Sequence, residues 1–270
     1  MSLLIIRLIT FLNGQPQNTT NYHIASVMIH HYSTLHSSSI DEIAKLCAVS
    51  KSTISKFART LGFDDYYDLK DNATLIEDRF NNPLNYLTNI VTGIQETGID
   101  NYFDAITKDI QYLREHLDMT AINRVALALL NHQNVYAFGL VFSESAAIDF
   151  QYKLAYAGKF IQTFPDDLVQ EDCLRQADED TLIIIFSNSG DYMVKQQIRT
   201  GTPIKDAFLH TKAKIMVITS NQRVAQLPFV AETVVFPHQT NYQTHTVMYQ
   251  IITDMIVTKY RQLLPFQKNP

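Results

Sequence analysis

The sequence predicts an all-α first domain followed by an α/β domain, whose parallel five-stranded sheet is covered by helices on both faces. Helical patterns fill the chain up to about residue 130, whereas from Asn134 onward short apolar segments alternate with helical ones. Such alternation is typical of a parallel sheet. At 270 residues, 46% of them hydrophobic and 18% charged, the chain can build two buried cores, which argues against general disorder.

In the first half, the stretch from Ile40 to Leu61 contains two short helical patterns around the break Ala48-Val49-Ser50. Apolar residues three and four apart give each helix one apolar face: Ile40, Ile43, Ala44 and Cys47 in the first, and Ile54, Phe57, Ala58 and Leu61 in the second. Ser50 is placed to cap the second helix, and Gly62 to end it.

Six polar or basic side chains of the second helix are left facing away from the shared core: Lys51, Ser52, Thr53, Ser55, Lys56 and Arg59. This pattern is what a helix-turn-helix motif needs to place a recognition helix in the major groove of DNA. A helical hairpin with a solvated face would show the same spacing, so spacing alone leaves both readings open.

Local charge favours DNA binding. Between residues 45 and 61 there are four basic residues and no acidic one, namely Lys45, Lys51, Lys56 and Arg59. The chain as a whole carries a net charge of −5, so any contact with DNA must be local. The affinity per copy should be modest, because the electrostatic part of DNA binding scales with the phosphates neutralised.

The rest of the first half reads as helical. Residues 1–12 are apolar but too short to span a bilayer and lack the features of a signal peptide, so we expect a buried or dimer-forming helix. Further helices are expected over 19–35 and 63–80. The break Asn81-Asn82-Pro83 predicts a first domain over 1–80, a helical linker over 81–107 and a second domain over 108–270.

The chain shows no spacing typical of a metal site. Cys47 and Cys173 are far apart, and the neighbouring His30 and His31 lack a further ligand at suitable spacing. We therefore expect no metal and no cofactor, and a reduced, cytoplasmic location without a membrane segment.

The second half offers short apolar strand candidates at 134–139, 160–164, 181–186, 214–219 and 233–236. Helices are expected over 145–157, less regularly after Gly190, and over 244–264. In open parallel sheets, ligands bind beyond the carboxyl ends of the strands.

Three of these strand ends are rich in small polar residues, at 139–143, 187–190 and 219–221. Ser187-Asn188-Ser189-Gly190 is the sharpest of them, because two hydroxyls and a glycine can form a concave backbone site for a phosphate. An ordinary strand-to-helix turn favours the same residues, so this alternative stays open.

Taken together, the chain resembles the RpiR-type bacterial transcriptional regulators. The resemblance rests on IDEIAKLCAVSKSTISKFARTLGFDDYYDLK in the first half and on TLIIIFSNSGD and KIMVITSN in the second. It implies a helix-turn-helix domain joined to a sugar isomerase (SIS) domain that binds phosphosugars. Lys56 stands where the family usually has Arg, which replaces a two-pronged guanine contact by a point charge.

By position, the resemblance implies that Ser143, Ser187 and Ser189 contact the phosphate, helped by Asn188 and backbone N–H groups near Gly190. Three residues depart from the family pattern, Val141, Phe142 and Tyr192. Val141 replaces a glycine and the two rings add bulk, so we expect a pocket that is narrowed, altered in preference or no longer used.

A phosphosugar isomerase would need a base, for which Glu144, Asp191 and His245 are the nearest candidates. Glu144 is expected at a helix N-terminus and His245 at an exposed helix start, and neither has an identifiable partner. We therefore predict a regulator rather than an enzyme: a homodimer or homotetramer that binds a double-stranded DNA operator and senses a phosphorylated sugar. The alternatives are a SIS domain that only oligomerises and, less favoured, an isomerase.

Overall fold

The computed structural model describes residues 3–73, 87–194, 206–236 and 238–264. The chain forms two compact units that divide after Thr88, and each is described by itself. The predicted break at residues 81–83 and the end of the helix expected over 63–80 lie outside the described residues.

The first unit is all-α. Its helices are α1 (Leu3–Gly14), α2 (Thr20–His30), the short η1 (Tyr32–Thr34), α3 (Ile40–Leu46), α4 (Lys51–Thr60) and α5 (Tyr66–Asp71). One apolar core joins them, with Leu4 and Leu8 of α1 fully buried beside Ile24, Ile54 and Phe57. The ring of Phe11 also meets that of Phe57 edge-on at 5.5 Å. The expectation that the N-terminal segment can form a buried helix is therefore confirmed.

Local capping sets the limits of the α3–α4 hairpin. Ser39 and Glu42 form a reciprocal capping box at the start of α3. Helix α3 ends at Leu46, and Ala48 follows with a φ of 51° that turns the chain toward α4. The hydroxyl of Ser50 accepts the N–H of Thr53 at 3.2 Å, so the predicted cap of α4 is confirmed.

The end of α4 is a Schellman motif. Gly62 has a φ of 81°, and the N–H of the following Phe63 donates to the carbonyl of Ala58 at 3.0 Å. The prediction that Gly62 closes this helix is therefore confirmed.

The second unit is built around a parallel sheet. Among the described residues the sheet has four strands in the order β1-β2-β3-β4: β1 (Asn134–Phe138), β2 (Thr181–Phe186), β3 (Lys214–Thr219) and β4 (Val230–Val235). Its helices are η3 (Leu87–Thr92), α6 (Gly93–Thr97), α7 (Ile99–His116), α8 (Met119–Asn131), α9 (Phe142–Tyr156), α10 (Asp167–Gln176), α11 (Asp191–Val194), α12 (Ala207–His210), η4 (Gln222–Gln226) and α13 (His245–Leu263).

The prediction of a fifth strand at 160–164 is wrong. This segment pairs with β1 through a single bridge between Tyr136 and Gln162. The side-chain amide of Gln170 donates hydrogen bonds to the backbone carbonyls of Phe164 and Gly139. The segment therefore lies beside β1 without extending the sheet.

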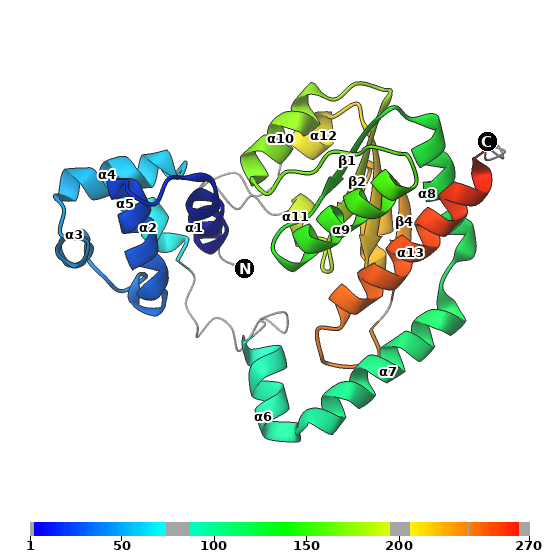
Figure 1. The fold of residues 1–270 in the computed structure, drawn as a ribbon, viewed down its shortest axis with the longest axis horizontal. Helices are drawn as coiled ribbons and strands as arrows, with labels where there is room; N and C mark the ends of the chain where they lie inside the picture. Colours follow the sequence, from blue (N-terminus) through cyan, green and yellow to red (C-terminus); the bar gives the residue numbers. More distant parts are fainter. Residues whose placement is uncertain (1–2, 74–86, 195–205, 237, 265–270) are drawn as a thin grey trace. The chain divides into compact units, whose positions relative to one another are not determined.

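Helices cover the sheet on both faces, as predicted (Figure 1). Helices α8, α9 and α13 share one core with Leu182, Ile184 and Phe186 of β2. The intervening Ile183 and Ile185 are also fully buried, and they face the opposite side of the sheet because side chains alternate along a strand. The chain thus leaves β1 toward one face and β2 toward the other, and ligands of open parallel sheets bind beyond the strand ends where such a reversal occurs.

In the parts of the chain described, every helix is too short or too polar to cross a membrane.

Candidate functional site

The first candidate site is the outward face of α4. Lys51, Ser52, Lys56 and Arg59 are exposed, and Thr53 and Ser55 are half-buried. Ile54, Phe57 and Ala58 are fully buried on the opposite face. All six residues predicted to contact DNA therefore lie on the side of the helix that the core leaves open.

Existing contacts on this face are weak enough to exchange for phosphates. Lys51 Nζ lies 2.6 Å from a carboxylate oxygen of Asp41, but both side chains are more than half exposed, at 59% and 64%. Exposed pairs of this kind contribute little and are screened by salt. Arg59 Nε donates to the carbonyl of Asp64 at 3.4 Å, which is a long hydrogen bond.

A residue that the sequence reading missed holds the far end of α4. Arg7 of α1 is 6% exposed, donates through Nη1 to the carbonyl of Leu61, and places its guanidinium 5.2 Å from the ring centre of Phe63. The sequence contains one indication of this contact: Arg7 is the only charged residue in the apolar segment 3–12, and a buried charge needs a partner.

The second candidate site is the SNSG loop (Ser187–Gly190) after β2. Its hydroxyls turn inward: Ser187 Oγ accepts the N–H of Gly190 at 3.1 Å, and Ser189 Oγ accepts the N–H of Asp191 at 3.2 Å. Gly190 has a φ of 84°, and a Cβ there would lie 2.6 Å from Val224 Cγ2. Only glycine fits this position without displacing its neighbour.

The loop after β3 holds the SNSG loop in place. The carbonyl of Asn188 accepts hydrogen bonds from Thr219 Oγ1 at 3.1 Å and from Ser220 Oγ at 2.9 Å. The side chain of Asn221 donates to the carbonyl of Ser189 at 2.7 Å. Two of the three predicted strand ends therefore form one connected structure.

The loop after β1 (Gly139–Ser143) lies at the same edge of the sheet, because β1 and β2 are parallel neighbours. A Cβ on Gly139 would lie 2.5 Å from the carbonyl oxygen of Ser143, so the start of α9 packs directly on this glycine. Ser143 is 8% exposed, and its Oγ lies 3.4 Å from the hydroxyl of Tyr249.

The three departures from the family pattern have different consequences. Val141 keeps a backbone typical of glycine, with φ 57° and ψ −114°. Phe142 packs its ring against that of His245 at 6.4 Å. Tyr192 is buried, donates to Gln170 Oε1 and meets Phe208 at 5.7 Å, so its ring belongs to the core beside α10 and α12.

Two of the groups considered as catalytic bases, Glu144 and His245, have pKa values shifted in opposite directions. Burial raises the pKa of Glu144, which lies in the first turn of α9. His245 is 5% exposed, so the expectation of an exposed side chain is wrong. Burial, and secondly the nearby His238, lower the pKa of His245 to about 4, which keeps this ring neutral near pH 7.

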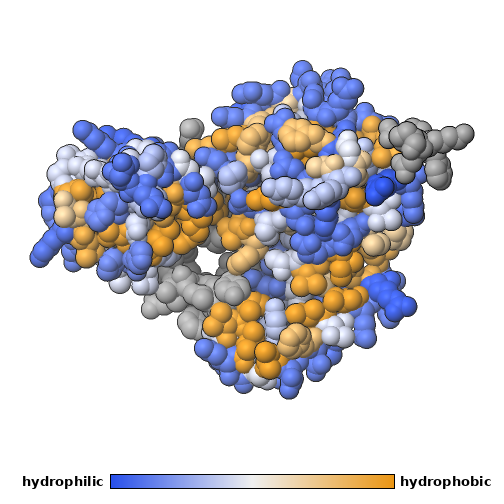
Figure 2. All heavy atoms as spheres, in the orientation of Figure 1, coloured by the Kyte–Doolittle hydropathy of each residue, from blue (hydrophilic) through white to orange (hydrophobic). Residues whose placement is uncertain are grey.

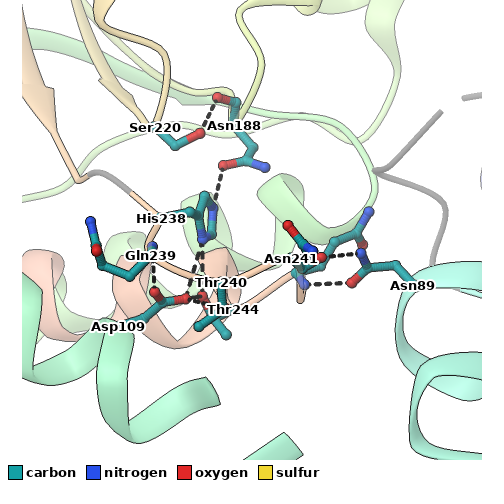
Figure 3. Close-up of polar contacts among 10 residues, drawn as sticks. Asn89, Asp109, Asn188, Ser220, His238, Gln239, Thr240, Asn241 and Thr244 are labelled. Carbon is teal, nitrogen blue, oxygen red and sulfur yellow. Dashed lines mark hydrogen bonds and ion pairs between the residues drawn. The ribbon is translucent and has the colours of Figure 1, made fainter. Parts of the chain in front are cut away.

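A buried polar cluster beside the SNSG loop was not predicted (Figure 3). Asp109 of α7 accepts hydrogen bonds from Gln239, Thr240 and Thr244, and the ring of His238 lies between Asp109 and Asn188. Asp109 and His238 are 129 residues apart, so no local pattern could have indicated their contact.

The described residues contain no cluster of three or more His, Cys, Asp or Glu side chains that could hold a metal. Cys47 is buried and Cys173 half-buried, and both are free thiols.

Residues 12–77 match the helix-turn-helix domain of the rpiR family. An uncharacterised HTH-type transcriptional regulator of Clostridium perfringens is 26% identical over 174 residues, and the match covers 62% of this chain and 62% of that protein. One from Providencia stuartii is 24% identical over 277 residues, covering 97% of this chain and 92% of its own.

Among solved structures, the NanR protein of Vibrio vulnificus complexed with ManNAc-6P superposes with a TM-score of 0.50 at 14% identity. The alignment covers 96% of this chain and 91% of that one. At this identity the likeness concerns the fold: a helical domain followed by an α/β domain.

Proposed function

We propose that this chain, whose residues 12–77 match the helix-turn-helix domain of the rpiR family, is a transcriptional regulator that senses a phosphorylated sugar. It would bind operator DNA through α4 and the sugar through the SNSG loop, as a homo-oligomer in the cytoplasm. We do not propose turnover of the sugar, because the fused DNA-binding unit calls for a sensor rather than an enzyme.

The observation that carries the proposal is the outward face of α4. Three of its exposed side chains are basic, Lys51, Lys56 and Arg59, and they lie on a helix whose start and end are both fixed by caps. Because its caps fix the helix in the free protein, α4 can enter the major groove without the entropic cost of forming the helix on binding. Lys56 and Arg59 would contact phosphates or guanine edges, while Ser52 and Ser55 would contact phosphates or bases.

The effector proposal rests on the loops after β1 and β2, which lie at the same edge of the sheet because the two strands are parallel neighbours. Ser143, Ser187 and Ser189 would contact the phosphate through their hydroxyls, helped by backbone N–H groups near Gly190. The NanR protein, whose fold is similar, was solved with a phosphosugar. A phosphorylated sugar suits such a site because its phosphate needs several donors.

The oligomer proposal rests on apolar side chains that the second unit leaves exposed (Figure 2). On α7, Ile99 and Phe103 are each 58% exposed and Ile110 37%, in positions that share one side of the helix. A second copy covering this stripe would pair two recognition helices, as a near-palindromic operator requires.

The DNA-binding part is tested with the double variant Lys56→Ala/Arg59→Ala. We expect affinity for a duplex selected from a random-sequence pool to fall roughly tenfold or more at fixed salt, with the salt slope reduced by about 2. The matched control is Lys108→Ala/Arg114→Ala, which removes one exposed lysine and one exposed arginine from α7. Equal loss in both variants would contradict a role for α4.

The effector part is tested by thermal unfolding with a panel of hexose and pentose phosphates and their unphosphorylated parents. We expect a phosphorylated member alone to raise the melting temperature, and Ser187→Ala to remove that shift. Ser145→Ala on α9 removes a hydroxyl outside the proposed site and should keep the shift. If no phosphosugar moves the melting temperature, the second unit only oligomerises.

A further inference from the structure

The cluster behind the SNSG loop has a geometry that packing alone does not require. Asp109 is fully buried on α7 and accepts from the N–H of Gln239 at 2.7 Å, from Thr240 Oγ1 at 3.0 Å and from Thr244 Oγ1. Burial alone would raise the pKa of Asp109, but the hydrogen bonds that it accepts hold it below its ordinary value. The carboxylate is therefore charged at neutral pH.

His238 joins this carboxylate to the SNSG loop. Its Nδ1 lies 3.4 Å from Asp109 Oδ2 and 3.1 Å from Thr244 Oγ1, and its Nε2 lies 3.2 Å from Asn188 Oδ1 (Figure 3). The His238 side chain is 19% exposed. Asn188, which it contacts, stands between the two serines proposed to hold the phosphate.

Two protonation states satisfy these contacts, and they differ in what Asn188 offers. If both ring nitrogens of His238 carry a proton, the ring donates to Asp109 and to Asn188 Oδ1, which leaves the amide NH₂ of Asn188 as a donor. If the ring is neutral with its proton on Nδ1, the amide of Asn188 must turn over so that its NH₂ donates to Nε2. The side-chain carbonyl oxygen of Asn188 then lies where its NH₂ group lay in the first state.

An anion distinguishes the two states. The state with a doubly protonated His238 places a positive charge behind the loop and leaves the NH₂ of Asn188 free to donate. The state with a neutral ring instead presents the side-chain carbonyl oxygen of Asn188, which repels a phosphate. Resting on the proposed function, we infer that His238 is a positioning residue of the effector site: it sets the orientation of Asn188 and takes up a proton when an oxyanion binds the SNSG loop.

The charges that face His238 support this coupling. In the described part of the chain they are Asp109 on α7 and His245 at the start of α13. Asp109 stabilises a protonated ring, while the buried His245 stays neutral through the pH range of interest and does not compete for the proton. The loop after β2 contributes only the uncharged amide of Asn188.

The test uses inorganic sulfate, which stays doubly charged from pH 5.5 to 8, so that any change with pH comes from the protein. The imidazole nitrogens of His238 are followed by ¹⁵N NMR in the full chain, and sulfate binding is titrated at several pH values. We expect sulfate to protonate both ring nitrogens at pH 7, and its affinity to fall roughly tenfold between pH 6 and pH 8.

Two variants isolate the effect. His238→Gln should bind sulfate weakly and with the same affinity at pH 6 and pH 8, and Asp109→Asn should flatten the pH profile while Asn188 is retained. His210→Gln, an exposed histidine of the same unit, should behave as the unaltered chain. Circular dichroism and the melting temperature confirm that each variant folds.

The outcomes separate the inference from the proposed function. Sulfate or a phosphosugar that binds with a pH profile unchanged by His238→Gln would overturn the role of His238 and leave the effector site standing. If neither sulfate nor any phosphosugar binds the unaltered chain, both fall, because His238 would have no site to serve.

Discussion

At the scale of single residues, Val141 adopts a backbone conformation that a β-branched residue rarely takes. Its φ of 57° and ψ of −114° belong to the region that glycine populates freely. The surrounding contacts impose this conformation, because the start of α9 packs directly on Gly139 two residues earlier. Strain of this kind costs of order 1–3 kcal/mol and is often found beside ligand sites.

Val141→Gly should therefore raise the free energy of unfolding of the second unit by about 1 kcal/mol. Thermal unfolding followed by circular dichroism measures this. The matched control is Val230→Gly at the start of strand β4, where the same exchange should lower stability, since the strand backbone needs no glycine. A lower melting temperature for Val141→Gly would show that the Val141 side chain stabilises more than its backbone costs.

His245 makes stability depend on pH. Its pKa of about 4 in the folded chain lies below the value of 6.5 expected when unfolded, so the unfolded chain binds a proton that the folded one excludes. The free energy of unfolding should fall as pH falls from about 6.5 towards 4, by as much as ~3 kcal/mol.

His245→Phe should flatten this dependence, because phenylalanine does not titrate. Its ring suits the position, where the His245 ring packs against Phe142 and Tyr249. Urea unfolding at pH 7, 6 and 5 gives the measurement. The exposed His210 provides the control, since His210→Phe should leave the slope unchanged. An unaltered slope in His245→Phe would assign the acid sensitivity to other groups.

At the scale of elements, the C-terminal end of α4 depends on a backbone conformation that Gly62 supplies. Gly62→Ala introduces a Cβ at a φ of 81° and should destabilise the first unit by about 1 kcal/mol. Gly14→Ala is the control, because a Cβ there meets nothing within 4 Å. Thermal unfolding of both variants tests this prediction. An equal change in stability would mean that the end of α4 tolerates alanine in place of glycine.

The α3–α4 hairpin could be predicted closely from sequence because its determinants are local. Ser50, Gly62 and the apolar spacing all act within a few residues of the structure they specify. The strands were also predicted, yet the last was expected at 233–236 and begins earlier, at Val230. The half-buried Glu232 interrupts its apolar run, as the position of β4 at the edge of the sheet allows.

Contacts between distant segments could not be predicted. Gln170 donates to the carbonyl of Gly139, Arg7 donates to the carbonyl of Leu61, and the ring of His238 contacts the carboxylate of Asp109. Each joins residues that no short window contains. The candidate site was therefore anticipated as far as its loops, and missed where it depends on the side chains packed behind them.

At the scale of the whole molecule, a regulator must couple its two ligands. If a phosphosugar weakens binding to the operator by some factor, the operator must weaken binding of that sugar by the same factor. Calorimetric titration of the sugar with and without saturating duplex should show this reciprocal change. Lys56→Ala/Arg59→Ala, which binds DNA poorly, should show the DNA-free sugar affinity in both experiments.

Sugar affinity that does not respond to DNA in the unaltered chain would mean that the sugar is not an effector, whatever its affinity. That result would favour a second unit with a structural role.

The backbone N–H of Gln239 has a further consequence, one that concerns exchange with solvent. The residue is exposed and lies outside every helix and strand, yet its amide donates to the fully buried carboxylate of Asp109 at 2.7 Å. Loop amides normally exchange with deuterium within seconds to minutes, whereas this one should exchange only when the cluster opens. Its exchange rate would therefore report, at a single proton, how often α7 and the loop before α13 come apart.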